Sequence, residues 1–197
     1  GVHLRLVNVG STPVIEQRQT LGYPICAICG QSVSPLASDA QIDHFVSSHA
    51  ERCGRKPEML GFFADVVADC LALPGCNDRT QAYSILEAVR MGAAQVLDMH
   101  LDDIQILVIG YVDRDEVDGL LWDPMPGGSG ILEQIRANFD KVLARAKEIA
   151  DGCPSGCEHS CIDCLQTFRN AHYHRYLDRN VVLKVIDASF LREENAV

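Results

Sequence analysis

The hydrophobic pattern of this chain changes its period several times, which predicts a mixture of strands and helices. Residues 3–9 alternate polar and apolar side chains, as a half-buried strand does, and residues 10–13 read as a loop. Residues 104–112 are aliphatic and β-branched, and residues 117–123 resume the pattern after a charged turn, so we expect a hairpin there. These strands predict a central sheet.

The helical period is clearest over residues 79–97, where apolar side chains recur every three or four positions and Asn77 or Asp78 can serve as the N-cap. We expect further helices over residues 39–53, 131–149 and 180–191, the last with Val182, Val185, Ile186 and Phe190 facing inward. The apolar run 60–73 is interpreted as a buried helix that carries Cys70 into the core. The predicted fold class is α/β in the mixed α+β sense, with helices packed on the sheet.

Composition narrows the class of protein. The chain has 197 residues, 47% of them hydrophobic, and a net charge of -10. No apolar run reaches the roughly 20 residues that cross a bilayer, so no membrane is expected. Nine cysteines without a signal-type segment predict a reducing, cytoplasmic location. The first residue is Gly1 rather than Met, so we expect a domain excised from a longer protein.

Four cysteines crowd one short segment, in the spacing Cys153-x3-Cys157-x3-Cys161-x2-Cys164. Disulfides between cysteines this close strain the backbone, whereas four thiolates converge readily on a metal. The segment therefore predicts a structural zinc site. An iron–sulfur cluster uses the same ligands and stays open as the alternative.

A second set of ligands reads Cys26-x2-Cys29 followed by His49-x3-Cys53. Two ligands four apart share one face of a helix, and a CxxC turn presents two thiolates, so the four can close a tetrahedron around zinc. His44 is turned off that face. The alternative is a redox-active dithiol, which a helix usually follows, whereas Gly30 and a polar loop follow here.

The domain organisation expected from these features has two parts. Residues 1–57 form a strand plus a Cys3His zinc module, and residues 58–197 form an α/β core that ends in the four-cysteine metal site. We expect the two parts to make one compact unit, clamped by one or two structural metal ions.

The sequence supports catalysis or nucleic-acid binding less strongly than it supports metal binding. Asp123, ahead of the glycine-rich turn 126–130, is interpreted as a turn cap; a metal-dependent nuclease built on it is the alternative. The net charge disfavours a protein that coats nucleic acid, but basic and aromatic residues interleave in one segment. The candidate nucleic-acid ligands there are Arg169, His172, His174, Arg175 and Arg179.

The order of GYPICAICG, HAERC, AVRMGAAQVLDMHLDDIQILVIG, LLWDPMPGGSGILEQI and the four cysteines resembles one known family. It is the domain at the C-terminal end of certain superfamily-2 DEAD/DEAH-box helicases, including those similar to mitomycin repair factor A and the helicase-partner protein of the DISARM phage-defence system. The resemblance implies a zinc site at the four terminal cysteines. It covers residues 22–183, and no Walker motif accompanies it.

This resemblance leads to a functional hypothesis: a non-catalytic, zinc-binding accessory domain of a DNA helicase or helicase-associated protein in DNA repair or phage defence. Its expected partners are helicase motor domains in the same chain or in a partner subunit, and DNA. It would brace the motor, guide the nucleic acid or dock a partner. A protein-docking module without nucleic-acid contact is the competing hypothesis.

Overall fold

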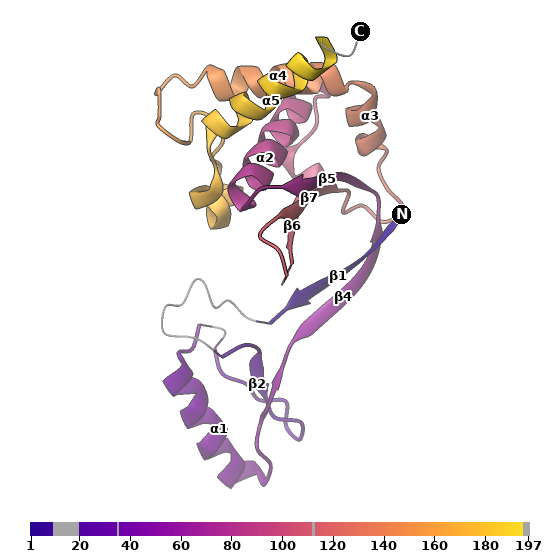
Figure 1. Ribbon diagram of the computed structural model, residues 1–197. Coiled ribbons are helices and arrows are strands. Elements are labelled where there is room, and N and C mark those ends of the chain that lie inside the picture. Colours follow the sequence, from indigo (N-terminus) through magenta and orange to yellow (C-terminus); the bar gives the residue numbers. More distant parts are fainter. Residues whose placement is uncertain (10–19, 35, 112, 195–197) are drawn as a thin grey trace. The chain divides into compact units, whose positions relative to one another are not determined.

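The structure is a computed structural model that describes residues 1–9, 20–34, 36–111 and 113–194, with side chains described up to residue 188. The chain divides into two compact units (Figure 1). Unit 1 comprises Gly1–Val2 and Val67–Val197, and unit 2 comprises His3–Val66. The predicted mixed α+β class is confirmed. The predicted boundary after residue 57 falls inside unit 2, whereas the contacts divide the chain at residues 66 and 67.

Unit 1 contains a three-stranded antiparallel sheet in the order β5-β7-β6, which lies on one side of helix α2, Arg79–Val96 (Figure 1). The strands are β5 (Cys70–Cys76), β6 (Gln105–Gly110) and β7 (Val117–Trp122). The hairpin predicted from residues 104–123 is therefore confirmed, and Ile106 lies opposite Leu121 in it. Leu121 is 1% exposed, which places the core directly on this face of the sheet.

Helix α2 (Arg79–Val96) lies between the sheet and the helices α4 (Phe139–Asp151) and α5 (Arg179–Glu194) (Figure 1). Its predicted N-cap is confirmed, because the side chain of Asp78 accepts a hydrogen bond from the Gln81 N–H at 2.8 Å. At Gly92 a β-carbon would stand only 2.6 Å from the carbonyl oxygen of Val142. A glycine is needed there for α2 and α4 to pack this closely.

The shorter helices of unit 1 differ in one respect from the prediction. The helix expected over residues 131–149 is broken at Asn138 into α3 (Ile131–Ala137) and α4, because the Asn138 backbone is not helical. The 3-10 helices are η1 (Leu101–Asp103) and η2 (Phe168–Tyr176). On α5, Val182 and Ile186 are buried as predicted, whereas the side chain of Phe190 lies outside the described residues.

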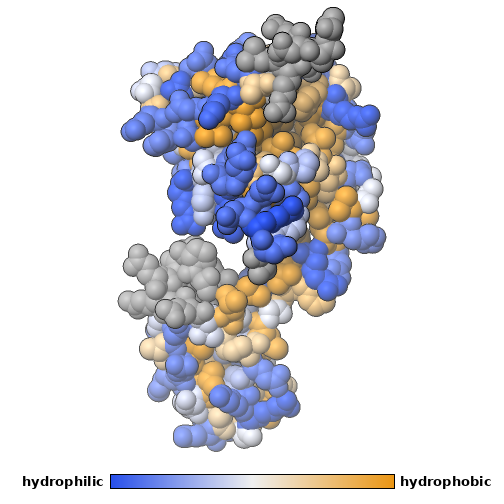
Figure 2. All heavy atoms as spheres, in the orientation of Figure 1, coloured by the Kyte–Doolittle hydropathy of each residue, from blue (hydrophilic) through white to orange (hydrophobic). Residues whose placement is uncertain are grey.

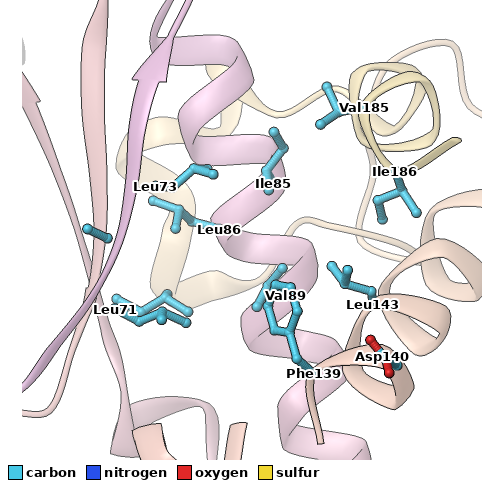
Figure 3. A pocket seen from close by; sticks show the side chains of 12 residues that line it. Leu71, Leu73, Ile85, Leu86, Val89, Phe139, Asp140, Leu143, Val185 and Ile186 are labelled. Carbon is cyan, nitrogen blue, oxygen red and sulfur yellow. The ribbon is translucent and has the colours of Figure 1, made fainter. Parts of the chain in front are cut away.

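An apolar groove of about 330 Å³ opens between α2, α4, α5 and strand β5 (Figure 3). Leucine, isoleucine, valine and phenylalanine side chains line most of it, and the carboxylate of Asp140 stands at its edge. Phe139 is 40% exposed within this lining.

The described residues of unit 2 contribute to two small sheets and one helix (Figure 1). One sheet pairs β1 (Val2–Asn8) with β4 (Phe62–Ala68), and the other pairs β2 (Tyr23–Ile25) with β3 (Glu58–Leu60). Helix α1 (Asp39–Cys53) has the predicted position. It begins with a capping box between Ser38 and Gln41 and ends at Gly54, whose φ is 74°.

The buried helix predicted over residues 60–73 is wrong, because this stretch forms β3, β4 and β5. Asp65 and Asp69 in this stretch are four positions apart, a spacing that places two residues on one face of a helix. In the structure Asp65 accepts two hydrogen bonds from Arg5 of β1, at 2.7 and 2.9 Å, across a pair of strands. Cys70 accordingly lies on a strand, half-buried.

Candidate metal centres

The sulfur atoms of Cys153, Cys157, Cys161 and Cys164 converge at one point of unit 1, within 4.8 Å of one another. Cys153 and Cys161 are 3.5 Å apart, Cys153 and Cys157 are 3.6 Å apart, and Cys157 and Cys164 are 3.7 Å apart. These separations exclude disulfides, whose sulfurs lie about 2.0 Å apart. A tetrahedron with Zn–S bonds of about 2.3 Å has edges of about 3.8 Å, so the four thiols fit zinc.

The loop that carries these cysteines follows α4 directly, and hydrogen bonds between its own backbone groups stabilise it. The N–H of Gly156 donates to the carbonyl of Cys153 at 3.0 Å, and the N–H of Gln166 donates to that of Cys161 at 3.0 Å. Gly156 has a φ of 54°, a conformation that favours glycine. The Cys161 N–H points at the Cys164 sulfur, 3.2 Å away, as an N–H does toward a thiolate.

The four-cysteine site is packed on the main hydrophobic core. Cys153 and Cys164 belong to the same buried cluster as Ala146, Leu165 and Ile186. Arg179, at the start of α5, donates hydrogen bonds to three backbone carbonyls around the loop. These belong to Ala150 at 2.7 Å, Asp151 at 2.9 Å and Cys157 at 3.1 Å.

The second cluster joins Cys26, Cys29, His49 and Cys53 within unit 2, again with the four ligand atoms within 4.8 Å of one another. The sulfurs of Cys26 and Cys53 are 3.7 Å apart, and Nε2 of His49 is 3.3 Å from the sulfur of Cys29. Two thiols come from the turn after β2, which the Gly30 N–H closes on the carbonyl of Cys26 at 2.8 Å. His44 is exposed on α1, away from the cluster.

In each cluster, hydrogen bonds from nearby backbone N–H groups favour the thiolate form of one cysteine. Backbone N–H groups of the CxxC turn, that of Cys29 foremost, lower the pKa of Cys26 to about 6. The backbone N–H of Cys157 does the same for Cys153, whose pKa is also lowered to about 6. The pKa of Cys53 is raised to about 11, first because its thiol is hydrogen-bonded to the Cys26 sulfur, which is the thiolate of the pair. A metal ion would replace the remaining thiol protons on binding.

Each cluster offers four protein ligands to one ion, and this closed arrangement is typical of structural rather than catalytic zinc. Within the described residues these are the only two groups of three or more histidine, cysteine or carboxylate side chains placed to share an ion. Four thiolates also suit an iron–sulfur cluster, so the ligand set alone leaves the metal at the four-cysteine site to experiment.

The predicted nucleic-acid residues do not form one free basic surface. Arg179 is occupied by the three carbonyls described above, and Arg169 is paired with Asp102. His174 is hydrogen-bonded through Nε2 to the Thr167 carbonyl at 2.9 Å and to the Asn170 side chain at 2.6 Å. His172 and Arg175 are exposed, and the Arg175 guanidinium lies 4.8 Å from the ring centre of Tyr176. A role in binding DNA stays a prediction.

Asp123 caps the glycine-rich turn, as the sequence suggested. Its two oxygens accept the N–H of Met125 at 2.9 Å and the N–H and hydroxyl of Ser129 at 2.5 and 2.6 Å. Burial opposes ionisation of Asp123, but these hydrogen bonds outweigh it and lower the pKa of the carboxyl below its usual value. With both oxygens bonded and 2% of the residue exposed, Asp123 has the geometry of a structural residue rather than of a nuclease ligand.

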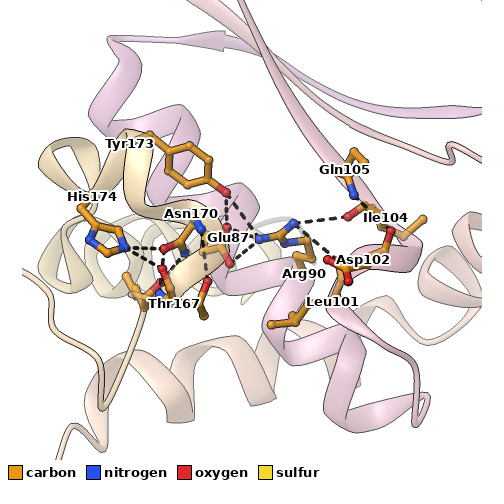
Figure 4. A network of polar contacts seen from close by, with 11 residues as sticks. Glu87, Arg90, Leu101, Asp102, Ile104, Gln105, Thr167, Asn170, Tyr173 and His174 are labelled. Carbon is orange, nitrogen blue, oxygen red and sulfur yellow. Dashed lines mark hydrogen bonds and ion pairs between the residues drawn. The ribbon is translucent and has the colours of Figure 1, made fainter. Parts of the chain in front are cut away.

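Helix α2 carries a buried ion pair that the sequence analysis did not predict (Figure 4). Nη2 of Arg90 donates to both carboxylate oxygens of Glu87, at 2.8 and 2.9 Å, and the Tyr173 hydroxyl donates to the same carboxylate at 2.7 Å. Glu87 is 0% exposed. Arg90 also reaches the carbonyl of Ile104 at 3.4 Å, so the pair joins α2 to η2 and to the start of β6. Glu87 and Arg90 both interrupt the apolar stripe of α2, so the sequence does contain a sign of this pair.

Comparison with known families identifies the class of domain. Residues 85–165 match the family described as MZB, the MrfA Zn-binding domain. All four residues of the four-cysteine site fall inside that stretch, as do Glu87, Arg90 and Asp123. The resemblance to the four-cysteine zinc-binding domain of helicases is therefore confirmed over these residues. The Cys3His cluster lies outside them.

Two individual proteins are also similar to this chain. Druantia protein DruE of Escherichia coli (strain UMEA 4076-1) is 34% identical over 201 residues, an alignment that covers 87% of this chain and 11% of DruE. The crystal structure of the DUF1998 helicase MrfA bound to DNA has a TM-score of 0.51 at 13% identity, covering 94% of this chain and 25% of MrfA. That likeness shows a shared fold. The chain thus spans a small part of both relatives.

No helix in the described part of the chain is long and apolar enough to span a lipid bilayer. The sequence prediction of a cytoplasmic location goes further than this finding and stays a prediction.

Proposed function

We propose that this chain is a zinc-stabilised accessory domain of a larger DNA helicase, in which it acts as a rigid scaffold that docks against other parts of the protein. One observation carries the proposal. The stretch that matches a helicase zinc-binding domain contains a closed four-cysteine cluster packed on the main core. A closed site supplies stability and leaves no position for a substrate.

The surface of unit 1 supports docking more than DNA binding. Arg169 and Arg179 are already paired or hydrogen-bonded, and the net charge of the chain is -10. Phosphate binding needs clustered free cations. The groove of Figure 3 instead exposes apolar side chains, among them Phe139, to a partner surface.

A fluorescence-anisotropy titration of the chain with single-stranded DNA, at low and at physiological salt, tests this proposal. We expect no saturable binding at physiological salt. Saturable, salt-dependent binding that Arg175→Ala weakens would overturn the scaffold proposal in favour of a nucleic-acid guide. Lys184→Ala, which removes one positive charge elsewhere on the surface, is the matched control.

Docking itself is tested in the full-length helicase that contains the domain. Phe139→Asp places a charge at the edge of the groove without touching either metal cluster. We expect it to lower the temperature at which the whole protein unfolds, and not that of the isolated domain. An equal effect on both, or no effect on either, would contradict docking through this groove.

A further inference from the structure

Within its described residues, 3–9, 20–34 and 36–66, unit 2 forms no cluster of buried apolar side chains. The buried side chains of the described residues form three apolar clusters, and every member of these clusters belongs to unit 1. Among the described residues of unit 2, only Leu4 and Ile42 are both large and aliphatic and less than 9% exposed. A unit of this size with so little buried apolar surface needs another source of stability, such as disulfides or a metal.

Several apolar side chains of unit 2 are exposed, and Figure 2 shows hydrophobic atoms on the visible face of the molecule. The exposed fractions are 61% for Ile28, 72% for Leu36, 56% for Phe62 and 64% for Phe63. Burial of such side chains is what normally offsets the entropy cost of folding. These residues cannot supply that contribution, and all the cysteines of the chain are free thiols, so disulfides do not supply it either.

What unit 2 does bury are ligand side chains. Cys26 is 1% exposed and His49 is 3% exposed. The ring of His49 is stacked on Phe45, with the ring centres 5.1 Å apart, and its Nδ1 has no hydrogen-bond partner among the described residues. Burying an imidazole in this way is costly unless Nε2 gains a strong partner. The nearest atom to serve Nε2 is the sulfur of Cys29, at 3.3 Å.

We propose that Cys26, Cys29, His49 and Cys53 bind a second zinc ion, and that this ion takes the place of a hydrophobic core in unit 2. The proposal goes beyond the family match, which stops short of this cluster. Zinc would join the turn after β2 to the last turns of α1, which contribute two ligands each. Binding requires three thiolates and a neutral imidazole, so the cysteines that are still protonated lose their protons to solvent and no redox change occurs.

The two sites are therefore expected to respond differently to removal of the metal. At the four-cysteine site, two cysteines are buried within the core of unit 1. At the Cys3His site, the sulfur of Cys29 belongs to an exposed residue, within reach of a competing chelator. Metal removal is expected to be faster from unit 2, and loss of metal is expected to unfold unit 2 while unit 1 keeps its structure.

Metal content and hydrogen exchange, measured on the whole chain, test the proposal. Elemental analysis is expected to find two metal ions per chain, at least one of them zinc, and one ion fewer in the Cys29→Ser, His49→Ala double variant. In that variant the amides of α1 are expected to exchange faster by roughly tenfold or more, while those of α2 exchange as in the wild type. Cys70→Ser, a cysteine outside both clusters, should change neither quantity.

Several results would overturn the proposal. One is a wild-type chain with a single metal ion that the double variant retains. Another is a double variant that has lost its zinc but still protects α1 from exchange. A third is a disulfide between Cys26 and Cys29 formed reversibly under mild oxidation, which would make this pair a redox dithiol. If the double variant cannot be purified, stepwise removal of zinc from the wild type by a chromogenic chelator provides the same comparison of α1 with α2.

This test of the Cys3His cluster is independent of the test of the proposed function. Loss of the second zinc would affect unit 2 alone, whereas the helicase scaffold proposal depends on the four-cysteine site of unit 1. A failed result for the Cys3His cluster thus leaves the four-cysteine site unaffected, and the reverse also holds.

Discussion

Arg179 and Cys157 are joined by a hydrogen bond of 3.1 Å, from Nη1 of the arginine to the backbone carbonyl of the cysteine. The same guanidinium donates to Ala150 and Asp151, in the last turn of α4, whose carbonyls have no partner within the helix. One side chain of α5 therefore ties the end of α4 to the loop that carries the metal ligands.

We expect Arg179→Ala to destabilise unit 1 by about 2 kcal/mol, because three carbonyls lose a charged donor. For a chain of this size that corresponds to a fall in melting temperature of roughly 4–8 °C. Urea unfolding of the zinc-loaded chain measures the change. Arg175→Ala, an exposed arginine on η2, is the control, and an equal effect of the two substitutions would contradict the role given to Arg179.

Cys161→Ser is expected to remove the metal from the four-cysteine site and to unfold or aggregate unit 1. Structural zinc contributes to folding directly, since the site does not exist in the unfolded chain. The melting temperature of the variant is compared with that of Cys70→Ser, a free cysteine outside the clusters. A melting temperature unchanged from the wild type would rule out a structural metal at these four cysteines.

Glu87→Gln is expected to cost about 3 kcal/mol or more, because it leaves the charge of Arg90 buried without a counter-ion. Tyr173→Phe removes only a hydroxyl from the same network and should cost about 1 kcal/mol. Chemical unfolding of both variants gives the comparison. The account is contradicted if Glu87→Gln is the milder of the two, since the carboxylate would then contribute little charge compensation.

The turn at Asp123 predicts a dependence on pH. The pKa of Asp123 is lowered in the folded chain, so its stabilising contribution is complete above the unfolded pKa of about 3.9 and is lost as the pH falls through the lower folded value. Asp123→Asn should therefore cost roughly 1–3 kcal/mol at neutral pH, and less below about pH 4.

Unfolding of the wild type and of Asp123→Asn, each measured at neutral pH and near pH 3.5, checks this prediction. Ser129→Ala, which removes one of the donors to Asp123, should reproduce part of the loss at neutral pH. A difference between wild type and Asp123→Asn that grows on acidification would have the wrong sign for a carboxylate of lowered pKa.

The sequence predicted those features in which local pattern and tertiary structure agree. Helix α2 followed from its apolar period and its cap at Asp78, and both clusters of cysteine and histidine side chains followed from spacings that are typical of metal sites. The hairpin of β6 and β7 followed from two aliphatic runs around a charged turn.

The errors lie where distant partners decide the structure. The run 60–73 is apolar on both sides, a pattern that a buried helix and a set of strands share, and its strands form because β1 and β7 pair with β4 and β5. Glu87 and Arg90 interrupt the apolar stripe of α2, but charged residues three apart on a helix usually form a surface pair, and their burial beneath Tyr173 depends on contacts with η2. Distant partners also occupy two of the predicted nucleic-acid ligands, since Arg169 pairs with Asp102 and Arg179 donates to backbone carbonyls, whereas DNA binding itself stays a prediction.

The central claim is that the four-cysteine site holds zinc as part of the fold. Elemental analysis of the chain purified without oxygen, together with its visible absorption spectrum, tests that claim most directly. A colourless protein that contains zinc, and that loses one zinc per chain in Cys161→Ser, is the predicted result. Iron in the protein, with a brown absorbance that disappears in Cys161→Ser, would contradict it and would make the site an iron–sulfur cluster.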